Sequence, residues 1–125
     1  NIFLIDGQPY IEINVDGDRA QMHLDTGAGI MLSSNYYKRH KQQIEKEGEI
    51  GTIGLGGFGG ARRLEKYGLS DVEFGIGGLR RMIPQVDVLT EDMLILVRDG
   101  SVGMDFLELF DRVVLDFANM VIRVE

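Results

Sequence analysis

Between Tyr10 and Leu24, apolar and polar residues alternate on both sides of an Asp-Gly pair. A period of two is typical of strands that bury one face and expose the other. The residues predicted to be buried are Ile11, Ile13 and Val15 in the first half, and Ala20, Met22 and Leu24 in the second. Asp16-Gly17 fits a two-residue turn in which both residues adopt a positive φ. The sequence therefore predicts a β-hairpin here, and the fold of the chain has to accommodate it.

Further strands are predicted because short apolar runs are separated by turns rich in glycine, which accounts for 17 of the 125 residues. The predicted strands outside the hairpin are Ile2–Ile5, Ile30–Leu32, Leu64–Phe74, Leu79–Leu89, Met93–Val97, Val113–Asp116 and Met120–Val124. A polar surface helix is predicted over Tyr36–Glu47, ending at Gly48, and a short buried helix over Met104–Phe110. The predicted fold class is all-β, a small closed barrel with one or two short helices in a single domain over residues 1–125.

Composition excludes several kinds of site and partner. The net charge of −7 provides no broad positive field to hold a nucleic acid. Cysteine is absent, which excludes disulfides, thiolate metal sites and a cysteine nucleophile. The two histidines lack the spacing of zinc ligands, so neither a metal nor a cofactor is expected. Apolar runs such as Met93–Val97 are far shorter than the roughly 18 residues of a membrane helix, so no membrane span is expected.

Asp25-Thr26-Gly27 places a carboxylate just past a buried strand, in a turn whose glycine allows close backbone approach. Backbone N–H groups of such a turn can bind the carboxylate, and the Thr26 hydroxyl can brace it. Two carboxylates about 3 Å apart cannot both ionise, so one keeps a proton. The charged carboxylate can then activate water while the neutral one polarises a peptide carbonyl. One motif supplies one carboxylate, so the second must come from another chain or lobe. The alternative is that Asp25 only caps a turn.

Gly54-Leu55-Gly56-Gly57-Phe58-Gly59 fits the pattern G-x-G-x-x-G of nucleotide-binding loops. We do not expect a nucleotide site, because no helix follows the pattern and no βαβ unit surrounds it. A hairpin tip that bends over an extended peptide explains these glycines better. Gly56, Gly57 and Phe58 are then candidates for contact with a substrate, while the alternative for Phe58 is packing against the barrel.

These features together resemble the retropepsin-like aspartic proteases, most closely the bacterial enzymes related to the retroviral Gag-polyprotein proteases. The resemblance covers nearly the whole chain. Asp25-Thr26-Gly27-Ala28 matches the catalytic motif, the segment 53–60 the flap hairpin, and Val102-Gly103 the step before the C-terminal helix. It implies an aspartic endopeptidase that cleaves polypeptides and is active as a homodimer or as a pseudo-dimer of two lobes. Asp25 would be the catalytic acid, Thr26 would brace the paired loop, and Gly27 would complete the motif.

Two departures from the family pattern keep alternatives open. Gly29 stands where the family commonly carries Ser, Thr or Asp after Ala28, and both residues are expected beside the substrate. Met104-Asp105 stands where retroviral members usually place Arg. The alternatives are a weak or inactive peptide-binding domain of the same fold, and one lobe of a tandem protein.

The chain begins at Asn1 rather than Met, so we expect a processed or excised piece. Bacterial members of this family are often exported, so the resemblance favours a location in the periplasm or outside the cell.

His23 lies two residues before Asp25, so strand alternation places both side chains on one side. One interpretation is a polar wall of the substrate pocket close to the scissile bond. The other is a histidine at a strand edge that faces solvent. His40 lies on the predicted polar helix and is expected at the surface.

Overall fold

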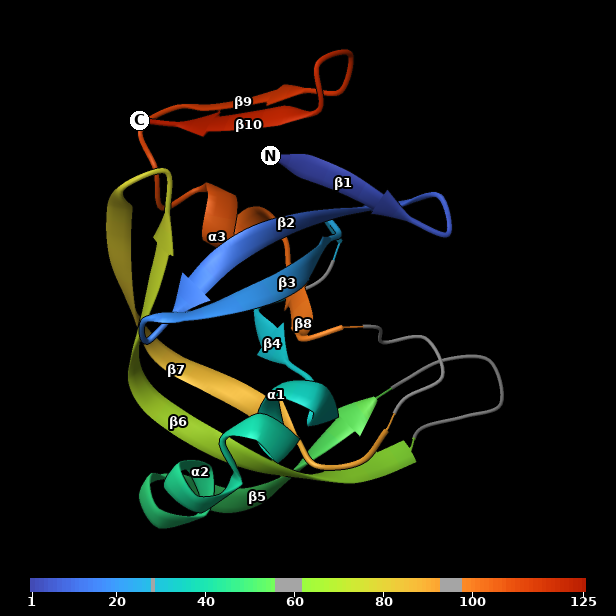
Figure 1. Ribbon diagram of the computed structural model, residues 1–125. Coiled ribbons are helices and arrows are strands. Elements are labelled where there is room, and N and C mark those ends of the chain that lie inside the picture. The colour runs from blue at the N-terminus through green and yellow to red at the C-terminus, as the bar shows by residue number, and fades with distance from the viewer. Residues whose placement is uncertain (28, 56–61, 93–97) are drawn as a thin grey trace.

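The computed structural model describes residues 1–27, 29–55, 62–92 and 98–125 (Figure 1). Ala28, Gly56, Gly57, Phe58 and the predicted strand Met93–Val97 lie outside these residues. The strands are β1 (Ile2–Ile5), β2 (Gln8–Val15), β3 (Asp18–Leu24), β4 (Met31–Leu32), β5 (Glu49–Leu55), β6 (Arg62–Ile76), β7 (Leu79–Leu89), β8 (Gly100–Val102), β9 (Val113–Asp116) and β10 (Val121–Val124). The helices are α1 (Ser34–Arg39), α2 (Lys41–Glu47) and α3 (Met104–Leu107).

One large sheet contains the strands in the order β1-β2-β3-β8-β4-β7-β6-β5. It curls on itself, because β2 also pairs with β6 through Asn14 and Gly75 and through Val15 and Phe74. The strands from β2 to β6 in that order therefore form a closed ring, which confirms the predicted all-β class. A separate hairpin, β9–β10, lies beside β1, where Ile2 N donates to Met120 O at 2.8 Å (Figure 1).

The predicted hairpin is present as β2 and β3, with Val15 opposite Asp18. Asp16 and Gly17 have φ of 48° and 84°, as the turn type requires. The residues predicted to be buried are buried, and Leu24 with an exposed fraction of 6% is the most exposed of them. Tyr10 differs from the prediction, since it belongs to the polar side of the strand and yet is fully buried.

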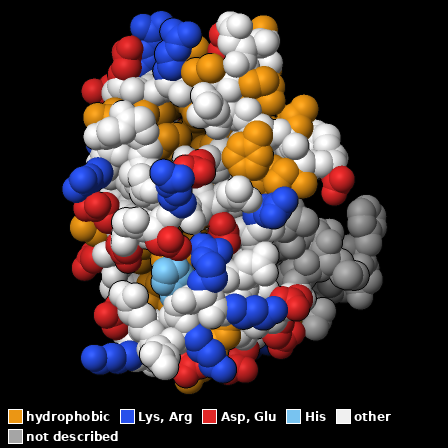
Figure 2. Space-filling view, viewed as in Figure 1, with side chains coloured by type: hydrophobic (Ala, Val, Ile, Leu, Met, Phe, Trp, Pro, Cys, Tyr) orange, Lys and Arg blue, Asp and Glu red, His pale blue; other side chains and the backbone are white. Residues whose placement is uncertain are grey.

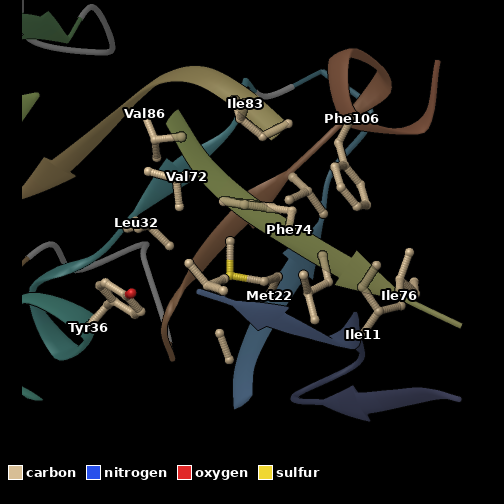
Figure 3. Packing of buried hydrophobic residues seen from close by; sticks show 14 of the residues in the cluster. Ile11, Met22, Leu32, Tyr36, Val72, Phe74, Ile76, Ile83, Val86 and Phe106 are labelled. Carbon is tan, nitrogen blue, oxygen red and sulfur yellow. The ribbon is translucent and has the colours of Figure 1, made fainter. Parts of the chain in front are cut away.

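The core inside the ring is built mainly from aliphatic side chains and three phenylalanines (Figure 3). Phe106 of α3 lies between Phe74 and Phe110, at centroid distances of 5.8 and 5.2 Å. All three rings are buried. The predicted buried helix is therefore confirmed in type, although it ends at Leu107 rather than at Phe110. The position of α3 is relevant to the site below, because α3 follows directly after β8, the strand that pairs with the end of β3.

The predicted single helix over Tyr36–Glu47 is wrong: there are two short helices, separated at His40 with φ −123° and ψ 26°. The break coincides with a hydrogen bond from His40 Nε2 to Asp18 Oδ2 at 2.9 Å, a tertiary contact that periodicity cannot reveal. Gly48 follows α2 in an extended conformation, not a left-handed one. A Cβ there would lie 2.8 Å from Ile44 O, so close packing accounts for the glycine. In the described residues, no helix has the length and apolar character needed to cross a membrane.

Candidate active site

Asp25 directly follows β3, on the outer surface of the ring. The backbone N–H of Asp25 donates to Val102 O at 3.0 Å, which continues the parallel pairing of Leu24 with Val102 in β8. Leu24 and Val102 are buried, whereas Asp25 is exposed. The buried Leu24 and its partner Val102 thus fix the backbone that leads into the acid, while the Asp25 side chain stays exposed.

The turn after Asp25 holds the carboxylate from one side. Gly27 N donates to Asp25 Oδ1 at 3.1 Å, as expected for a backbone N–H in this turn. Within residues 1–27, 29–55, 62–92 and 98–125, no hydrogen bond engages the second oxygen, Oδ2. Thr26 and Gly27 are exposed beside it. The carboxylate is therefore oriented, and one of its oxygens stays available.

Gly29 lies next to two side chains that sequence reasoning did not assign to the site. Ser101 of β8 is buried, and its hydroxyl donates to Gly29 O at 3.3 Å. The Oδ2 atom of Asp105 lies 3.6 Å from the point that a Cβ of Gly29 would occupy. Gly29 thus has a carboxylate beside it but no side chain of its own with which to reach Asp25. Gly29 lies just before β4, whose antiparallel pairing with β8 places Met31 opposite Ser101, and neither spacing nor composition indicated this.

His23 lies on the same strand as Asp25 and is half-buried. Its Nε2 lies 3.3 Å from Gln8 Oε1, and its ring centroid lies 5.1 Å from that of Tyr10. Tyr10 is in turn stacked on Phe3 at 5.9 Å. The imidazole therefore belongs to a small cluster with Phe3 of β1 and with Gln8 and Tyr10 of β2. The sequence did not indicate Gln8 and Tyr10 as neighbours of His23, because these contacts run between strands.

A network of charged groups anchors the segment that leads into β8. Asp99 is buried, and its carboxylate accepts hydrogen bonds from Gln21 N at 2.8 Å and from the Arg39 guanidinium. Arg39 also donates to Asp18 at 3.1 Å. The hydrogen bond from His40 is the largest influence on Asp18 and, together with Arg39, holds the pKa of that carboxyl below its usual range, although burial acts in the opposite direction. The network ties α1 and β3 to the start of β8.

The other predicted substrate contacts belong to the segment between β5 and β6. The two strands pair antiparallel from Glu49 and Gly68 to Leu55 and Arg62, so they form the flanks of a hairpin. The residues of the predicted contact, Gly56, Gly57 and Phe58, lie outside the described residues, as does Ala28. In the part of the chain that is described, no three His, Asp or Glu side chains are grouped as metal ligands would be.

Comparison with known proteins identifies the fold. The structure is similar to EIAV protease complexed with the inhibitor HBY-793, with a TM-score of 0.55 and 21% identity over 85% of this chain and 90% of that one. It is also similar to a retropepsin-like aspartic protease from Rickettsia conorii, with a TM-score of 0.62 and 19% identity over 92% of this chain and 81% of that one. No protein-family model matches the sequence, and no curated protein matches it.

Proposed function

Starting from a chain that has the retropepsin-like fold, we propose that it is an aspartic endopeptidase domain in which Asp25 is one of two catalytic acids. The observation that carries the proposal is the Asp25 carboxylate, exposed at the end of a buried strand and oriented by Gly27 N–H. Such a carboxylate has a role in peptide hydrolysis only when a second one faces it, because the pair must share a proton.

The reaction assigned to the pair is hydrolysis of a peptide bond by water. Of two carboxylates about 3 Å apart, only one ionises readily. The ionised carboxylate removes a proton from the water that attacks the scissile carbonyl, and the protonated carboxylate donates a hydrogen bond to the carbonyl oxygen. As the tetrahedral intermediate forms, the carbonyl oxygen takes the proton of the second carboxyl. When the C–N bond breaks, the proton taken from water passes to the leaving amine, and a hydroxyl of the intermediate returns a proton to the other carboxylate. Thr26 and Gly27 belong to this site as the residues that shape the turn.

The second acid is assigned to a second copy of this lobe. Asp25 lies on the outside of the ring, so a partner can approach it without unfolding the barrel. Hydrophobic side chains gather on the surface over β1 and the β9–β10 hairpin (Figure 2). Leu4 of β1 and Phe117, in the turn between β9 and β10, have exposed fractions of 57% and 51%. Exposed apolar area of this kind favours association. The copy comes from a homodimer or from a second lobe of a tandem protein.

An extended polypeptide is the substrate that fits the proposal. A peptide that adds to a barrel as a strand gains backbone hydrogen bonds, and pockets for alternate side chains give selectivity. The hairpin formed by β5 and β6 is the element proposed to cover it, with Gly56, Gly57 and Phe58 at its tip as proposed contacts. Ala28, Gly29 and His23 are proposed contacts on the side of Asp25.

The test is cleavage of a peptide library between about pH 4 and 7, with and without pepstatin. We expect cleavage by the parent protein and none by Asp25→Asn, while Asp111→Asn, which removes an exposed acid outside the site, retains full activity. For a homodimer, activity per molecule rises with protein concentration, and sedimentation shows the dimer. Equal cleavage by Asp25→Asn would remove Asp25 from the mechanism. Peptide binding without turnover would instead favour the non-catalytic alternative that Gly29 raises.

A further inference from the structure

The face of the β2–β3 hairpin that carries Asp25 is lined by polar and aromatic groups. Tyr10 and His23 are directly opposite in the β2–β3 register, so their side chains emerge on the same face. Gln8 and Asp25, each two residues further along, share this face by alternation. The opposite face belongs to the core, with Ile11 and Met22 fully buried. Any substrate side chain that lies beside Asp25 on this hairpin therefore meets Gln8 and His23.

His23 and Gln8 are held together in a way that leaves donor groups free. The Gln8 carboxamide oxygen can only accept, so the 3.3 Å contact requires that His23 Nε2 carries the hydrogen. Among the described residues the Gln8 amide nitrogen has no acceptor, so both of its hydrogens are available to another partner. Gln8 is exposed and His23 is half-buried, so this pair faces outward. The imidazole ring also packs against the Tyr10 ring in a tilted arrangement, with an angle of 36° between the ring planes.

The surroundings of the pair are also polar. Ser101 of β8 is paired with His23 in the sheet and is buried. The Tyr10 hydroxyl is buried and has no hydrogen-bond partner among the residues that the structure describes. Burial raises the pKa of Tyr10; the Arg98 guanidinium acts against this rise and the Asp6 carboxylate adds to it, so charges of both signs lie near the cluster. The face formed by Gln8, Tyr10 and His23 therefore provides hydrogen-bonding groups where an apolar pocket would present aliphatic carbon.

We propose that Gln8 and His23 bind the side chain of a substrate residue next to the scissile bond, and that they select side chains ending in a carbonyl-type oxygen, the carboxamides and carboxylates of Asn, Gln, Asp and Glu. This inference rests on the proposed function. An oxygen acceptor pairs with the free Gln8 N–H groups, whereas an aliphatic side chain would cover them and leave them without a partner. Sites built to hydrogen-bond a substrate group reject analogues that lack it.

The experiment uses extended peptides in which the residues flanking the cleaved bond are Gln, Glu, Leu or Phe. For the parent protein we expect kcat/KM for Gln or Glu to exceed that for Leu by about ten-fold. The His23→Leu variant should lose this preference and favour Leu. The control is Gln21→Leu, on the same strand and face but further from Asp25, and it should keep the parent ranking. A higher rate for Gln than for Glu identifies carboxamides, and the reverse identifies carboxylates.

Two results would overturn the inference: a parent protein that cleaves Leu or Phe peptides best, or an unchanged ranking in His23→Leu at a melting temperature equal to that of the parent. If no peptide is cleaved at all, the proposed function fails, and the specificity is then decided by binding. Fluorescence anisotropy of the same labelled peptides should show tighter binding of Gln or Glu than of Leu, lost in His23→Leu. Absence of that difference, or absence of binding, overturns it.

Discussion

Removing the Arg39 guanidinium should destabilise the barrel far more than removing a neighbouring surface cation. Arg39 joins Asp99 and Asp18, and the Asp99 side chain has an exposed fraction of only 10%. In Arg39→Met, the Asp99 carboxylate stays buried and keeps Gln21 N as its donor. An uncompensated buried charge is expensive because water no longer solvates it.

The magnitude follows from the burial of the two partners. Breaking a fully buried ion pair costs about 3–5 kcal/mol. The Arg39 side chain has an exposed fraction of 41%, so solvent screens part of the interaction. We therefore expect a loss of about 2–3 kcal/mol in the free energy of unfolding, which corresponds to a fall of about 8–11 °C in melting temperature for a chain of this size. The stability of Arg39→Lys should lie between that of the parent and that of Arg39→Met, because an ammonium group keeps the charge but cannot reproduce the planar contacts to both acids.

The matched control is Lys41→Met, which removes a cation from the adjacent helix. Lys41 Nζ lies 4.0 Å from Glu45, and the two side chains have exposed fractions of 62% and 42%. A surface pair of this kind contributes less than about 0.5 kcal/mol. Urea denaturation followed by far-ultraviolet circular dichroism measures both variants. If Arg39→Met and Lys41→Met differ by less than about 0.5 kcal/mol, the reasoning about the buried carboxylate is refuted.

Three further changes test other parts of the fold by the same denaturation assay. Phe106→Ala should cost about 3–5 kcal/mol because the ring is fully buried between two others, whereas Leu109→Ala, with an exposed fraction of 41%, should cost much less. Gly100→Ala should be strongly destabilising because its Cβ would lie 2.1 Å from a β4 carbonyl oxygen, whereas a Cβ at Gly54 would meet no atom of the described residues within 4 Å. Asp18 has a lowered pKa, so the native state binds fewer protons than the unfolded chain near pH 4 and its contribution is lost as pH falls. Asp18→Asn should therefore be less stable than the parent at pH 6, and the difference should shrink as the pH falls below the usual carboxyl pKa of 3.8; a constant difference would contradict this.

The sequence could predict those parts of the fold that depend on neighbouring residues. The β2–β3 hairpin follows from alternation and from Asp16-Gly17, whose φ angles match the turn. The turn of Asp25-Thr26-Gly27 also follows from local chemistry, since Gly27 N–H reaches the carboxylate within the turn. The position of Asp25 relative to β8 was accessible only through the family resemblance, because the pairing partners are distant in the chain.

What could not be predicted depends on contacts between distant segments. Tyr10 sits at a polar position of its strand, yet Phe3 and His23 from neighbouring strands cover it. The helix break at His40 accompanies a hydrogen bond to Asp18 on another element. Asp99 looks like an ordinary turn residue in the sequence, and only the fold brings Arg39 to it. Periodicity indicates which face of a strand or helix is buried, but it does not indicate which distant residue packs against that face.

The parallel pairing of β3 with β8 has a consequence for how the molecule folds. Met22 is paired with Gly100, so this contact closes a long loop, and such contacts form slowly. The backbone of Asp25 obtains its support at Val102 only when that loop is closed. A growing polypeptide emerging from the ribosome therefore lacks this support for the acid until residue 102 has been made. The support of the proposed catalytic acid is therefore among the contacts that form late.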